Sequence, residues 1–159
     1  MYERLIELLQ NQSVLYSELL ESAQQKKGYI IKNDIESISK VTSRENTLIG
    51  KLRQAERERQ AQAADIAKRL HISSDGLTLA ILISRVNNSS IQERLECLRM
   101  QLRSAMDDLK ALNDQNRALI NQSLEYIDFT VNLLRSTVSG PVYAGAEEIH
   151  GQVFFEARG

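Results

Sequence analysis

The histidines and the single cysteine are the first residues to consider as metal ligands or as a catalytic thiol. The two histidines, His71 and His150, lie far apart in the sequence, with no HExxH pattern and no neighbouring cysteine. A zinc site needs several such ligands at short spacing, so no metal site is predicted. Cys97 is the single cysteine, which excludes an internal disulfide and a CxxC site. Because it precedes an apolar position, we expect Cys97 to be a partly buried small hydrophobe rather than a reactive thiol.

Catalytic patterns are also missing from the sequence. It contains no GxxxxGK[ST], GxGxxG or GxSxG motif. The adjacent acids Asp107 and Asp108, and Glu147 and Glu148 where helical, would point to different faces, which favours a solvated surface over an acid/base pair. We therefore expect no enzyme activity, no catalytic residues and no cofactor.

Charge and hydropathy argue against nucleic acids and membranes as partners. Twenty Lys and Arg stand against 21 Asp and Glu, a formal charge of −1, so nothing favours binding to nucleic acid. The basic residues between Lys51 and Arg69 are interleaved with acids, as on a solvated helix face, which leaves nucleic-acid binding a weak alternative. The longest apolar run, Leu79 to Ile83, is too short to cross a membrane. With one cysteine and no secretion signal, we expect a cytoplasmic protein.

Glycine and proline divide the 159 residues into two regions. Residues 1–138 contain three glycines and no proline, whereas residues 139–159 contain four glycines and Pro141. Both residue types disfavour helix interiors, so the first region is predicted to be a helical body and the second a flexible tail. Aromatic residues make up only 5% of the chain, which argues against a sheet. The predicted fold is all-α.

Apolar residues at alternating steps of three and four predict helices over residues 2–31, 34–71, 77–86 and 90–138. Asn33 or Asp34 could cap the second helix, and the break there is either a turn or a kink. Ser90 and Glu93 form a capping box expected to start the last helix.

The last predicted helix is about 70 Å long, so it must pack lengthwise against the earlier helices. An elongated antiparallel helical hairpin or bundle results. Such a body has a thin core, and part of its apolar stripe stays exposed unless a partner covers it.

Amide side chains interrupt this stripe at Asn113, Asn116 and Gln122. Two interpretations remain open. A buried Asn116 could fix the register of the helices. Alternatively, the mixed apolar and amide face could receive a helix of a partner.

The segment Leu112-Asn113-x-x-Asn116-x-x-Leu119-Ile120, followed by Tyr126 and Leu133-Leu134, resembles the C-terminal helix of the FlgN family of flagellar export chaperones. The leucine-rich first helix, the Lys32 to Ile35 turn, the Arg57-x-Arg59 region and the tail with Pro141-x-Tyr143 follow the family's order, so the resemblance covers nearly the whole chain.

The resemblance implies a cytosolic chaperone that holds hook-associated, filament-junction proteins by their amphipathic C-terminal segments and delivers them to the flagellar type III export gate and its ATPase machinery. Tyr143 matches the tail tyrosine that helps to dock on the gate. The matching client-binding positions are Leu112, Asn113, Asn116, Leu119, Ile120, Leu124, Ile127, Val131 and Leu134.

A structural coiled-coil scaffold without a secretion client is the alternative. In that interpretation the apolar stripe serves self-association, and the chain is a stable homodimer whose seam includes Asn116.

Overall fold

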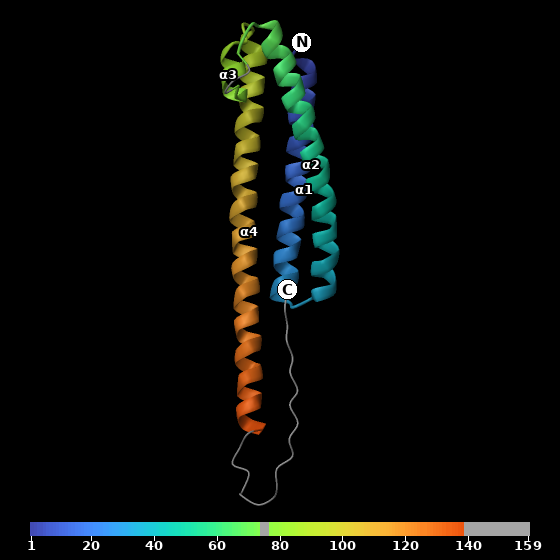
Figure 1. Ribbon diagram of the computed structural model, residues 1–159, viewed down its shortest axis with the longest axis vertical. Helices are drawn as coiled ribbons and strands as arrows, with labels where there is room; N and C mark the ends of the chain where they lie inside the picture. Colours follow the sequence, from blue (N-terminus) through green and yellow to red (C-terminus); the bar gives the residue numbers. More distant parts are fainter. Residues whose placement is uncertain (74–76, 139–159) are drawn as a thin grey trace, which may run out of the picture. The chain divides into compact units, whose positions relative to one another are not determined.

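The computed structural model describes residues 1–73 and 77–138, with the side chains of residues 137 and 138 excepted. It contains the helices α1 (Glu3–Ile31), α2 (Ile35–Arg69), α3 (Leu79–Ser84) and α4 (Ser89–Val138) (Figure 1). These bounds lie within two residues of the predicted ones, and no strand occurs in the described ranges. The described residues fall into two units, one from Met1 to Ser123 and a second that begins at Leu124. The predicted flexible tail, 139–159, lies outside the described residues.

A turn, rather than a kink, separates α1 from α2. Asn33 adopts a left-handed conformation with φ 54°, and the Asp34 amide donates to the Tyr29 carbonyl at 3.0 Å. Asparagine tolerates this conformation better than most residues with a Cβ. The Asp34 carboxylate then accepts from the Ser37 amide at 3.1 Å and caps α2. The chain therefore reverses, and α1 and α2 form an antiparallel hairpin (Figure 1).

Residues next to the end of α2 and the start of α4 determine where these two helices stop and begin. α2 ends beside His71, which also has φ 54°, and the Ile72 amide donates to the Ala67 carbonyl at 2.9 Å. The start of α4 corrects the predicted capping box. Asn88 is the capping residue, with its Oδ1 accepting from the Ile91 amide at 3.1 Å, and Ser90 lies inside the helix. Asparagine and serine cap about equally well, so the earlier residue could begin the helix.

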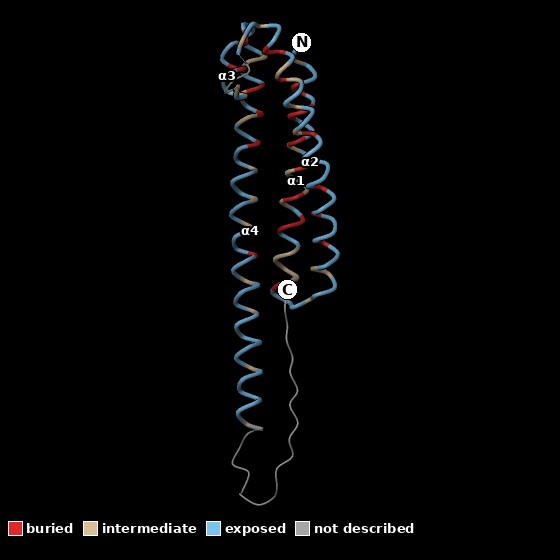
Figure 2. The backbone as a smooth tube through the Cα atoms, in the orientation of Figure 1, coloured by how far each residue is buried: buried red, intermediate tan, exposed pale blue. Residues whose placement is uncertain are grey.

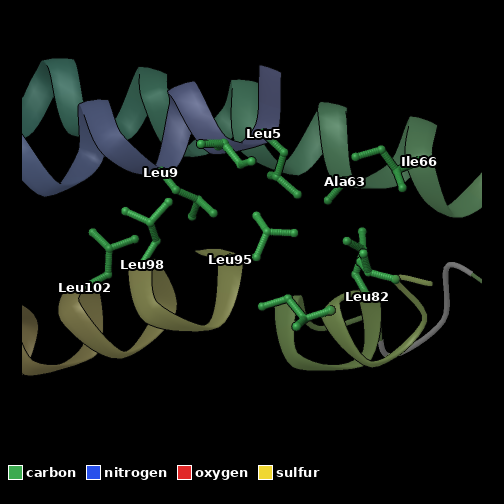
Figure 3. Packing of buried hydrophobic residues seen from close by; sticks show 11 residues of the cluster. Leu5, Leu9, Ala63, Ile66, Leu82, Leu95, Leu98 and Leu102 are labelled. Carbon is green, nitrogen blue, oxygen red and sulfur yellow. The ribbon is translucent and has the colours of Figure 1, made fainter. Parts of the chain in front are cut away.

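One apolar cluster joins all four helices at one end of the first unit. Leu95 and Leu98 of α4 point toward Leu5 and Leu9 of α1 (Figure 3). Leu82 of α3 lies on the side of Ala63 and Ile66 of α2 in the same view. Leu5, Leu9, Ile66, Leu82 and Leu95 are each fully buried. This cluster fixes α3 and the first turns of α4 on the hairpin.

A second, smaller cluster lies farther along the hairpin and consists of Leu15, Leu19, Leu48 and Ala55, with Leu52 and Leu109 packed against it. Farther still, Lys26 Nζ of α1 and Glu45 Oε2 of α2 form an ion pair of 2.5 Å with both side chains largely buried. Figure 2 shows how buried positions recur along α1 and α2. Ile35 and Ile49, which follow the apolar spacing of α2, are nevertheless exposed.

Candidate functional site

The predicted client-binding residues before Ser123 all lie on α4 but differ in exposure. Leu112 and Leu119 are half-buried, Asn113 is exposed and Ile120 is 39% exposed. Asn116 is buried, and its Nδ2 donates to the backbone carbonyl of Ala23 in α1 at 2.9 Å. Its amide therefore contacts the chain itself, as the register interpretation expects, and is not presented on the surface.

The predicted client-binding residues after Ser123 share one face of α4 and are all exposed. Leu124, Ile127, Val131 and Leu134 recur at steps of three and four, and their exposed fractions are 54%, 52%, 39% and 60%. At about 100° per residue, these positions fall within a strip about 80° wide on the helix. We call these four residues the seam face. An exposed apolar strip of this kind is typical of a surface that receives another amphipathic helix.

A second apolar strip lies on the other side of the same helical segment and was not predicted as a site. Tyr126, Phe129 and Leu133 are 71%, 65% and 52% exposed. They lie about 140° to 200° around the helix from Leu124. We call them the aromatic face. The i, i+3, i+7 spacing of these three residues was the signal that could have revealed it.

The other residues singled out by their chemistry do not gather into a site. Cys97 is exposed, which corrects the expectation of partial burial: Leu95 and Leu98 turn toward the core, and Cys97 lies on another side of α4. His71 is exposed at the turn after α2. His150 and Tyr143 lie outside the described residues.

The described part of the chain lacks a metal-binding cluster and a membrane-spanning helix. Residues 1–73 and 77–138 contain no group of three or more His, Cys, Asp or Glu side chains placed to hold a metal ion. Within the same ranges, no helix combines the length and apolar character that a bilayer crossing requires.

The chain matches the model of a known protein family. The family model described as FlgN protein matches residues 1–147. The chain belongs to the FlgN family. No curated protein and no solved structure matched it.

Membership in the FlgN family gives the chain a general role. The family consists of flagellar export chaperones and is not a family of enzymes. Its members bind flagellar proteins. The all-α hairpin with an exposed apolar segment of α4 is consistent with such a role, since a chaperone needs apolar surface for its client.

Proposed function

We propose that this FlgN-family chain is a cytoplasmic export chaperone that binds the amphipathic C-terminal segments of hook-associated proteins and delivers them to the flagellar export gate. The exposed seam face of α4 is the observation that carries the proposal. Hook-associated proteins have terminal segments that pack only in the assembled filament, so their apolar faces need a temporary cover before export.

The nine client-binding positions divide into two roles in this proposal. Leu124, Ile127, Val131 and Leu134 are the main client contacts, and Leu112, Asn113, Leu119 and Ile120 of the first unit are additional client contacts. Asn116 holds the register of α4 on α1. No cofactor or catalytic step is required, because binding rests on buried apolar area less the ordering cost of the client segment.

Calorimetric titration of the full chain with the C-terminal segments of the two hook-associated proteins tests the client site. Leu124→Asp/Ile127→Asp should abolish binding, because it places two charges on the seam face. Asn121→Asp/Asn132→Asp is the matched control, since it adds the same charges to exposed polar positions of α4. Equal affinities of the two variants would refute the seam face as the client site.

Docking on the export gate is tested with the tail tyrosine. Tyr143→Ala should weaken binding of the chaperone–client complex to the cytosolic domain of the export gate while leaving client affinity unchanged.

Sedimentation of the chain alone distinguishes the scaffold alternative from the chaperone proposal. A stable dimer that binds neither client segment would establish that alternative and overturn the chaperone proposal.

A further inference from the structure

A groove of about 800 Å³ in the first unit is lined by residues from α1, α2 and α4, together with Leu79 of α3. It lies where the two apolar clusters separate along the hairpin. The buried residues of the first cluster end at Leu9 and Leu102, with Tyr16 packed against the cluster, and the buried residues of the second begin at Leu15. Between them, α1 presents the polar Gln12. The core is therefore interrupted here, and a concave surface remains open between α2 and α4.

The inner part of this groove is apolar. Leu9 and Leu102 are buried, Tyr16 and Leu52 are half-buried, and Met106 is 51% exposed. Methionine adapts its shape to different partners, so an exposed methionine at the edge of an apolar groove suits a binding surface.

The walls of the groove are strongly basic. Arg53, Arg57 and Arg59 come from α2, and Arg99 and Arg103 come from α4. Glu56 is the one acidic residue that lines the groove, and Glu96 pairs with the lining residue Arg99, so the five arginines exceed these two acids by three charges. The whole chain carries −1, which means that positive charge is concentrated at this place.

Three of the five arginines form no ion pair within the described ranges, so a ligand can bind them. Arg59 is held by Glu56 through two hydrogen bonds of 2.7 and 2.8 Å, and Arg99 is held in the same way by Glu96. Arg53, Arg57 and Arg103 are exposed and make no hydrogen bond or ion pair with any residue in the described ranges. Exposed guanidinium groups on both walls can bind carboxylates of a ligand placed between them.

We infer that this groove is a second docking site, distinct from the seam face, and that its occupant is an acidic amphipathic helix of a partner protein. The lining residues from Leu52 to Arg59 and from Arg99 to Met106 each extend about 10 Å along their helices, which matches about two turns of a bound helix. Leucine-like side chains of the partner would fill the apolar inner part, while its carboxylates pair with Arg53, Arg57 and Arg103. This inference goes beyond the proposed client function and does not depend on it.

Fluorescence anisotropy with a labelled synthetic helix of about 14 residues, leucines along one face and glutamates beside them, tests the inference on the full chain. Arg53→Glu/Arg57→Glu/Arg103→Glu should weaken binding at least about tenfold, and the triple change to Gln should weaken it less. The matched control is Lys51→Glu/Lys110→Glu/Arg117→Glu, which reverses three exposed charges outside the groove and should leave the affinity unchanged.

Two further probes separate the amphipathic ligand from simpler ones. A peptide with lysine in place of glutamate should not bind, and Met106→Asp should weaken binding of the acidic peptide. An acidic peptide with serine in place of leucine that binds as tightly as the original would overturn the inference, because charge alone would then suffice. Equal affinities of the groove and control variants would overturn it as well. A wild-type dimer that dissociates on charge reversal in the groove would identify a second copy of the chain as the occupant and refute the partner helix.

Discussion

The side-chain amide of Asn116 in α4 donates a 2.9 Å hydrogen bond to the backbone carbonyl of Ala23 in α1. Asn116 is 2% exposed and Ala23 is fully buried, so the bond forms away from water. A helical carbonyl can accept a second hydrogen bond, and the small alanine side chain lets the amide reach it. The contact fixes one position of α4 along α1, which apolar packing alone would specify less strictly.

Replacing Asn116 with alanine is therefore expected to lower the free energy of unfolding by about 1 to 2 kcal/mol. The substitution removes the hydrogen bond and leaves unfilled space against Ala23. Asn113→Ala is the matched control, since Asn113 is an exposed amide on the same helix and its loss should change stability by less than about 0.5 kcal/mol. Urea denaturation followed by circular dichroism measures both. Equal midpoints for the two variants would show that the buried amide does not stabilise the helix pair.

The ion pair between Lys26 and Glu45 should contribute measurably to stability. Its side chains are only 16% and 11% exposed, so removing one partner leaves the other charge poorly solvated. Glu45→Gln is expected to cost about 1 to 3 kcal/mol in the free energy of unfolding. Glu36→Gln is the control, because the pair of Glu36 with Lys40 is more than 70% exposed on both sides and should contribute under about 0.5 kcal/mol. If both variants unfold at the same urea concentration, the buried ion pair contributes no more to the free energy of unfolding than the exposed one.

Glu56 should make stability depend on pH in the acid range. Hydrogen bonds from Arg59, and then from Gln12 and Gln60, lower the pKa of Glu56 from 4.5 to about 2. Because the folded-state pKa is depressed, the stabilisation is fully present above pH 4.5 and is lost as the pH falls through about 2. The side chain is 39% exposed, so solvent screening limits the effect to roughly 1 kcal/mol. Urea midpoints at a series of pH values should fall less steeply for Glu56→Gln than for the wild type, and parallel curves would contradict this assignment.

The same carboxylate links α2 to α1. Gln12 of α1 donates to Glu56 Oε2 at 2.9 Å, while Arg59 and Gln60 approach from α2 itself. Tyr16 lies in the same groove, and burial, followed by the charge of Glu56, raises the pKa of its hydroxyl. Glu56 therefore orders one wall of the groove and leaves Arg53 and Arg57 on the same helix available for a ligand.

Local features of the sequence determined the helices and their ends. The glycine and proline distribution, the three-and-four spacing and the residues at Asn33, Asp34 and His71 act over one or two turns, so they can be interpreted without knowing the tertiary contacts. The predicted start at Ser90 failed because Asn88 offers an equally good cap two residues earlier. The predicted client-binding positions came from family resemblance together with this same periodicity.

Only the tertiary structure decided which positions are covered and which distant residues meet. Leu95 and Leu124 follow one apolar pattern, yet the first is fully buried and the second is 54% exposed. Periodicity specifies the face of a helix on which a residue lies, but burial requires another element opposite that face. For the same reason the sequence left the role of Asn116 open until its contact with Ala23, 93 residues away, was known. The sequence analysis placed Arg53, Arg57 and Arg59 on a solvated helix face. Arg99 and Arg103 lie on the opposite wall of the same groove only because of tertiary packing, which local sequence patterns do not specify.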